Sequence, residues 1–124
     1  MIKGIGIDSI EIARIDRIRR EYGDRFLERV YTPGERAHAA RFQAPELRLA
    51  ARFAAKEACL KALGTGWIPG VRWQDIEVVS DSGGKPALAL HGGAEKIFRK
   101  LQASAIHLSI THSKELATAV VILE

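Results

Sequence analysis

The chain has 124 residues, of which 47% are hydrophobic and 27% charged, so it has the size and composition of one compact domain and not of a disordered segment. Its formal net charge of +4 favours an anionic partner, such as a nucleic acid, a phosphorylated cofactor or an acidic protein. Cys59 is the single cysteine, which excludes an intrachain disulfide and a multi-cysteine zinc site, and we expect a cytoplasmic location. No apolar run reaches membrane-spanning length, so no membrane contact is expected.

The first predicted element is a strand over residues 2–7 that ends at Asp8. Ile5 and Ile7 share one face, and the glycines beside them share the other face, where they permit close approach of another segment. Two interpretations of Asp8 are open. As the start of a capping box with Glu11 it would cap the following helix, which is the favoured interpretation for this segment alone. As an acid at the end of a strand it could instead bind a hard cation such as magnesium.

A helix is predicted from Ser9 to about Tyr22, because isoleucines recur there at helical spacing. The helix and the segment after it are strongly basic. A solvated helix face and a binding patch for an acidic partner explain this equally well. The arginines concerned are Arg14, Arg17, Arg19, Arg20, Arg25 and Arg29.

The alanine-rich stretch 46–63 predicts the longest helix, ended by the glycines that follow. At about 100° per residue, Glu57 lies far around the helix from Arg48 and Arg52, which mark the expected solvent side. Lys61 follows one turn after Glu57 on the same small-residue face. The two could form an ordinary ion pair worth about 0.3–0.5 kcal/mol, or belong to a functional site.

Two apolar runs, 76–79 and 87–90, flank a turn-rich insert and predict a β-hairpin. The insert contains Gly83-Gly84-Lys85-Pro86, which fits a turn better than a phosphate-binding loop because the Walker pattern is absent.

A short helix over 94–101 and strands over 106–111 and 117–123 complete the predicted elements. The first of these strands alternates apolar residues with a polar row that is either its solvent face or a phosphate-binding surface. That row consists of His107, Ser109 and Thr111, with His112 and Ser113 at its end. The whole pattern predicts one α+β domain over 1–124, with mainly antiparallel strands packed against helices.

Two segments resemble the signature segments of the 4'-phosphopantetheinyl transferase superfamily: Gly6-Ile7-Asp8-Ser9-Ile10-Glu11 and Arg52-Phe53-Ala54-Ala55-Lys56-Glu57-Ala58-Cys59-Leu60-Lys61-Ala62. They contain the patterns G-x-D and F-x-x-K-E-x-x-x-K, with no departure at the charged positions. The resemblance is closest to the short, single-domain branch, the holo-acyl-carrier-protein synthases, and covers essentially the whole chain. It implies transfer of the 4'-phosphopantetheine group of coenzyme A to a serine of an apo acyl carrier protein, with release of 3',5'-ADP, in support of fatty acid biosynthesis.

The resemblance also implies roles for individual residues. Asp8 and Glu57 would bind Mg²⁺, and Lys61 would lie near the cofactor phosphates. The reaction itself needs a base to remove the serine proton, and our candidate is Glu57, acting directly or through a metal-bound water. A homotrimer with shared active sites is implied as well. The residues expected to bind coenzyme A are Arg52, Lys61, Gly84, Lys85, Pro86, His107, Ser109, Thr111 and His112. Those expected to bind the acidic carrier protein are Arg14, Arg20 and Arg25.

Two competing hypotheses fit the sequence less well. A basic module that binds RNA or an acidic protein leaves Asp8, Glu57 and Lys61 unexplained. The aromatic content of 6% and the lack of a known RNA-binding motif also argue against a nucleic-acid partner. The larger, double-unit transferases that act on peptide and polyketide synthases need about twice this length.

Overall fold

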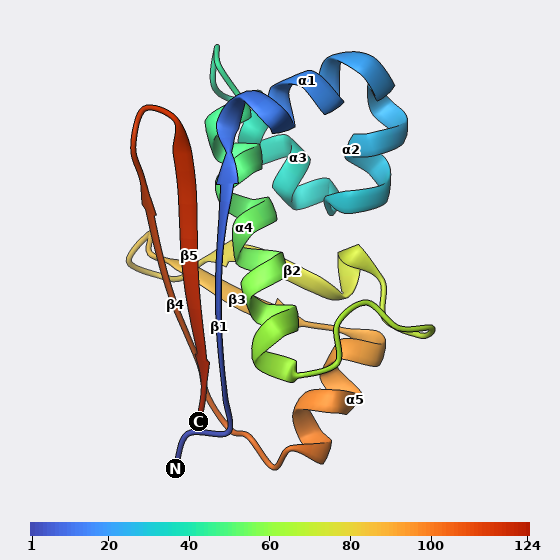
Figure 1. Ribbon diagram of the computed structural model, residues 1–124, viewed down its shortest axis with the longest axis vertical. Helices are drawn as coiled ribbons and strands as arrows, with labels where there is room; N and C mark the ends of the chain where they lie inside the picture. The colour runs from blue at the N-terminus through green and yellow to red at the C-terminus, as the bar shows by residue number, and fades with distance from the viewer.

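The structure, a computed structural model that describes residues 1–124, confirms the expected α+β class (Figure 1). Its elements are β1 (Gly4–Glu11), α1 (Ile12–Tyr22), α2 (Asp24–Val30), α3 (Pro33–Ala40), α4 (Glu46–Leu63), the 3-10 turn η1 (Trp73–Asp75), β2 (Ile76–Ser80), β3 (Pro86–Leu90), α5 (Gly92–Lys100), β4 (Ile106–His112) and β5 (Leu116–Leu123).

The strands form two antiparallel sheets with α4 between them. The three-stranded sheet has the order β1-β5-β4, and β2 pairs with β3 as the predicted hairpin. Figure 1 shows α4 in the middle of the molecule, with α1, α2 and α3 gathered at one end and α5 at the other. A core of 22 buried residues joins α4 to both sheets. No helix is both long and apolar enough to cross a membrane.

The first strand is longer than the sequence predicted, and this decides between the two interpretations of Asp8. β1 continues to Glu11, and Asp8 lies within its ladder, opposite Ala119 of β5. Helix α1 begins only at Ile12, and its N-cap residue makes no side-chain capping bond. The capping hypothesis for Asp8 is therefore wrong, because pairing with β5 holds this residue in the strand.

Helix α4 lies directly on the backbone of β1. A Cβ atom added to Gly6 would be 1.9 Å from the carbonyl oxygen of Ala58, and one added to Gly4 would be 2.0 Å from that of Ala62. Both alanines are buried in this contact. Glycines on the strand and alanines on the helix thus allow an approach that any larger residue would prevent.

The bounds of α4 match the prediction, but the expected solvent side does not. The helix ends at Gly64, whose φ of 82° is typical of a glycine C-cap. Arg52, expected to be exposed, is only 8% exposed, and Lys56 on the same side is fully buried. The reason is that α3 and β2 pack on this side of α4, which leaves Glu57 and Lys61 at the more open edge.

The three-stranded sheet has an uncovered outer face. Ile5 and Ile7 on β1 are 63% and 61% exposed, and they pair with Ile122 and Val120 of β5. The polar row of β4 continues the same face, as the alternation predicted. The helices lie on the other side of this sheet (Figure 1).

Candidate active site

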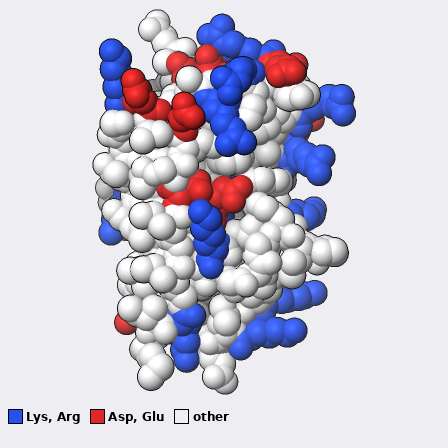
Figure 2. Space-filling view, viewed as in Figure 1, with Lys and Arg blue, Asp and Glu red and all other residues white.

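Asp8 and Lys61 meet where β1 passes α4. The Lys61 Nζ donates to the backbone carbonyl of Ile7 at 2.9 Å and lies 3.1 Å from Asp8 Oδ1. The Asp8 side chain is 18% exposed and that of Lys61 is 54% exposed, so the pair is open on one side. Figure 2 shows acidic and basic side chains side by side over β1 and α4, in the middle of this face.

Glu57 joins this pair from the preceding turn of α4. Burial raises the pKa of its carboxyl group, and the negative charge of Asp8 raises that pKa further. The Trp67 indole donates to Glu57 Oε1 at 3.5 Å, and together with the charges of Lys61 and Arg14 it opposes the rise. The structure therefore brings Asp8, Glu57 and Lys61 together from segments far apart in the sequence.

The donor set at this place fits magnesium that is shared with a phosphate. The chain has no group of three or more histidine, cysteine or acidic side chains that could hold a metal alone. Asp8 and Glu57 supply two carboxylates whose mutual repulsion a cation would relieve. Mg²⁺ is commonly held by one or two carboxylates, with substrate phosphates and waters completing its octahedral shell.

Arg52 lies away from these carboxylates, beside a hollow of about 240 Å³ on the other side of α4. The hollow is lined by Gly34, His38, Arg52, Glu77, Val78, Val79 and Ser80. The Arg52 Nε atom is buried and has no hydrogen-bond partner. Because a buried guanidinium group without a partner is costly, an anion in this hollow would stabilise it.

The hairpin insert is a turn, as the sequence favoured. Asp81 Oδ1 accepts the backbone N–H groups of Gly83 and Lys85, each at 2.9 Å, and Gly84 has a φ of 82°. The turn ends at Pro86, the first residue of β3. The residues of this turn are exposed, so the expected contacts with coenzyme A require a ligand that lies on the protein surface at the turn.

The polar row of β4 is not brought to Asp8 within one chain. His107, Ser109 and Thr111 lie on the outer face of the sheet, whereas Asp8 lies on the inner face, toward α4. The whole of β5 also separates β4 from β1. His107 instead pairs with Glu124 at 2.9 Å. His112 lies at the end of β4, where it lines a separate hollow near the start of α4.

The expected carrier-binding arginines lie on α1 and α2, at one end of the molecule. Arg14, Arg20 and Arg25 are exposed, and only Arg20 is paired, with Asp16 at 2.9 Å. Figure 2 shows basic side chains gathered over α1 and α2. The charge of Arg14 also lowers the pKa of Glu57, so this arginine acts electrostatically on the cluster.

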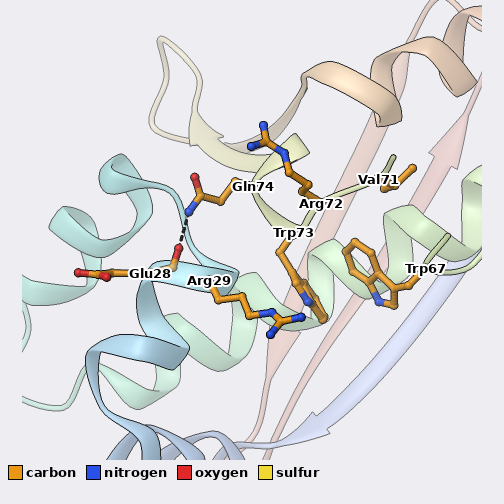
Figure 3. A pocket seen from close by; sticks show the side chains of 7 residues that line it. All are labelled: Glu28, Arg29, Trp67, Val71, Arg72, Trp73 and Gln74. Atoms are coloured by element: carbon orange, nitrogen blue, oxygen red, sulfur yellow. Dashed lines mark hydrogen bonds between the residues drawn. The ribbon is translucent and has the colours of Figure 1, made fainter. Parts of the chain in front are cut away.

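Sequence reasoning missed a hollow of about 470 Å³ that is lined by Trp67, the residue that donates to Glu57 (Figure 3). The Trp67 and Trp73 rings form one wall, with centroids 4.0 Å apart, and Phe53 stacks on Trp73 at 5.0 Å. The lining residues are Glu28, Arg29, Trp67, Val71, Arg72, Trp73 and Gln74. Both tryptophans of the chain lie in or just after the irregular segment that follows α4, which was the available indication.

Lys56 was also missed, although it belongs to the F-x-x-K-E-x-x-x-K pattern. It is fully buried and forms an ion pair of 2.7 Å with the equally buried Glu35. At about 100° per residue, Lys56 falls on the side of α4 that carries Leu49 and Leu60, so a helical projection would have marked it as a charge on an apolar face.

Comparison with known proteins agrees with this geometry. The family model described as the 4'-phosphopantetheinyl transferase superfamily matches residues 4–121. A holo-[acyl-carrier-protein] synthase of Solibacter usitatus is 54% identical, covering 100% of this chain and 99% of its own. The crystal structure of the synthase from Neisseria meningitidis has a TM-score of 0.90 and 35% identity, covering 100% of this chain and 99% of its own. The structure from Bacillus anthracis, in complex with CoA (3',5'-ADP), has a TM-score of 0.81 and 43% identity, covering 99% and 96%.

The chain therefore belongs to the 4'-phosphopantetheinyl transferase superfamily. Within it, the chain groups with the holo-[acyl-carrier-protein] synthases, to which these relatives belong over essentially their full length, and it is an enzyme of that transferase class.

Proposed function

We propose that this chain transfers the 4'-phosphopantetheine group of coenzyme A to a serine of an apo acyl carrier protein, at a centre formed by Asp8, Glu57 and Lys61. The observation that carries the proposal is the 3.1 Å contact between Lys61 and Asp8, with Glu57 one turn away on α4. Two carboxylates and an ammonium group at one open place suit a reaction of phosphate groups.

In this reaction the serine hydroxyl attacks the β-phosphorus of coenzyme A and 3',5'-ADP leaves. Lys61, on a half-exposed stem, can neutralise the charge that builds on the phosphate oxygens. Mg²⁺ held by Asp8 and Glu57 would supply further positive charge there. Glu57 is our candidate for the group that accepts the serine proton, directly or through a metal-bound water, since burial raises the pKa of its carboxyl group and makes it a better proton acceptor.

Coenzyme A would then extend from this centre to two further surfaces. Arg52, with its unpartnered Nε, suits a phosphate group of coenzyme A. The exposed turn from Gly84 to Pro86 could contact the same molecule from the protein surface. His107, Ser109 and Thr111 of β4 could contact the same coenzyme A only from another copy of the chain, because this outer row faces away from Asp8, and His112 would join them from the end of β4. This supports sites shared between two copies, as in the homotrimer that the resemblance implies.

The acidic carrier protein would dock on the basic face of α1 and α2, through Arg14, Arg20 and Arg25. Exposed arginines can steer an acidic partner toward the centre, and the effect of Arg14 on the pKa of Glu57 supports a docking face close to the chemistry. The cytoplasm and fatty acid biosynthesis remain the expected setting. The only cysteine is buried and forms no disulfide.

The proposal is tested by mass analysis of an apo acyl carrier protein after incubation with coenzyme A and the chain, with Mg²⁺ or with a chelator. We expect the mass increase only with Mg²⁺. Asp8→Asn and Glu57→Gln should lower the transfer rate about a hundredfold and weaken the Mg²⁺ dependence, while the melting temperature stays near that of the wild type. Glu95→Gln on α5 is the matched control, since it removes an exposed carboxylate at the other end of the molecule. Folded Asp8 and Glu57 variants with normal rates would contradict the proposed centre.

A further inference from the structure

Lys56 stands next to Glu57 in the shared sequence pattern, yet the proposed chemistry gives it no role. Its side chain leaves α4 on the buried side, opposite the open edge where Lys61 lies. No part of Lys56 is exposed, so it touches neither of the expected substrates.

The Lys56 ammonium group is fully paired. It lies 2.7 Å from Glu35 Oε1 and donates to the backbone carbonyls of Trp73, at 3.2 Å, and Ile76. Three donors thus meet three acceptors. Glu35 is satisfied as well, because its oxygens accept the backbone N–H groups of Thr32 at 2.9 Å and Val78 at 2.8 Å. The pair joins α3, α4 and the η1–β2 segment at one point.

From this point a continuous set of contacts returns to Glu57. Lys56 holds the carbonyl of Trp73, whose ring lies 4.0 Å from the ring of Trp67. The Trp67 indole N–H in turn donates to Glu57 Oε1 at 3.5 Å. Figure 3 shows the two indole rings side by side beside α4. This series of contacts therefore begins on α4 at Lys56 and ends on α4 at Glu57, the next residue, which lies on a different face of the helix.

We propose that Lys56 is a positioning residue for the transfer reaction: with Glu35 it fixes the η1 segment and its tryptophan, and through Trp67 it orients the Glu57 carboxylate. The inference rests on the proposed role of Glu57. A purely stabilising pair is the alternative, and the two differ in outcome. Replacing both members of a buried ion pair can restore stability, whereas it cannot restore bonds to the carbonyls of Trp73 and Ile76.

The test compares Lys56→Met with the double variant Lys56→Met/Glu35→Gln. The single variant leaves Glu35 buried without its cation and should have a much lower melting temperature. The double variant removes both charges and should recover much of the lost melting temperature. Its kcat should nevertheless be several-fold below that of the wild type, because Trp67 no longer holds Glu57 in place.

Tryptophan emission provides a reading that does not depend on activity. The chain has two tryptophans, and both lie in the contact set, so their emission reports on it alone. In the double variant we expect a shift to longer wavelength, as the rings become more hydrated. Trp67→Phe, which retains an aromatic ring but removes the N–H donor, should lower kcat several-fold without lowering the melting temperature. Lys96→Met, at an exposed lysine of α5, is the control and should change none of these quantities.

A double variant with recovered stability, wild-type kcat and unchanged emission would overturn the positioning role. If that variant does not fold, Trp67→Phe decides: a normal kcat would overturn the proposal and a reduced kcat would support it. Failure of the proposed function would look different, because Asp8→Asn and Glu57→Gln would then remain active. The emission shift would still establish whether Lys56 holds the tryptophans.

Discussion

Arg14 belongs to the basic face of α1 and also acts electrostatically on the proposed centre. It is exposed, makes no ion pair, and its positive charge lowers the pKa of Glu57. A guanidinium group in this position can both attract an acidic carrier protein and stabilise the ionised form of the carboxylate that the carrier's serine must approach.

Reversing this charge should weaken carrier binding selectively. Arg14→Glu is expected to raise the KM for the carrier protein about tenfold, and the KM of this variant should depend less on salt than that of the wild type. Because Arg14 lowers the pKa of Glu57, its loss should raise that pKa, so the activity lost as pH falls should be lost at a higher pH. Steady-state kinetics with each substrate varied in turn give the comparison, and Lys100→Glu on α5 is the control. Equal increases of the two KM values would contradict the docking role.

Single residues show where sequence reasoning was sufficient and where it was not. The convergence of Asp8, Glu57 and Lys61 was expected from the resemblance, and the structure places them together. The local sequence of Asp8 favoured a helix cap, which was wrong because its partner strand lies over a hundred residues later. The burial of Arg52 and Lys56 depends on α3 and β2 packing against α4, and the composition of α4 alone does not contain that information.

Among the elements, the closest contact is between β1 and α4, and Gly6 is its critical residue. An added Cβ would meet the backbone of α4 at 1.9 Å from the Ala58 oxygen and 2.7 Å from the Ala62 nitrogen. Backbone atoms cannot move aside by changing a rotamer, so the helix itself must shift. Such a shift would also separate Lys61 from Asp8.

Gly6→Ala should therefore lower the free energy of unfolding by about 3 kcal/mol, with loss of transfer activity in the protein that still folds. Denaturant unfolding followed by circular dichroism measures the change. Gly83→Ala is the matched control, since a Cβ there meets only the Asp81 carboxylate at 3.5 Å, and it should change the free energy by less than about 0.5 kcal/mol. A Gly6→Ala variant as stable as the wild type would mean that α4 does not rest on β1 as described.

Elements that are formed by interactions between residues close in sequence were predicted more accurately than the others. α4, the β2–β3 hairpin and strands β4 and β5 were expected close to their observed bounds, because periodicity and local turns define them. Helices α2 and α3 were not expected. Thr32-Pro33-Gly34-Glu35 combines residues that are common in turns, yet it begins α3 with a complete capping box and a proline in the first turn. Residues that interrupt one helical pattern can also form the N-terminal cap of the next helix.

At the scale of the whole molecule, the outer face of the three-stranded sheet needs an explanation. It exposes isoleucines of β1 beside apolar residues of β5, bordered by the polar row of β4. One copy of the chain also holds the parts expected to bind coenzyme A on opposite faces of this sheet. Assembly through this face would cover the apolar residues and bring the β4 row of one copy toward Asp8 of another.

We therefore expect a homotrimer in light scattering, and its disruption by a charge on this face. Ile5→Lys replaces a residue that is already 63% exposed in one copy, so it should leave the fold of each copy intact but yield monomers with little transfer activity. Tyr22→Lys changes a comparably exposed residue of α1, outside the sheet, and should leave the oligomeric state unchanged.

Sharing of sites can be tested separately by mixing two inactive variants, Asp8→Asn and Ser109→Arg. If each site combines Asp8 from one copy with the β4 row from another, the mixed oligomers should regain part of the activity, since some sites then contain neither substitution. A wild-type monomer that is fully active, or mixtures with no recovery, would contradict the shared site.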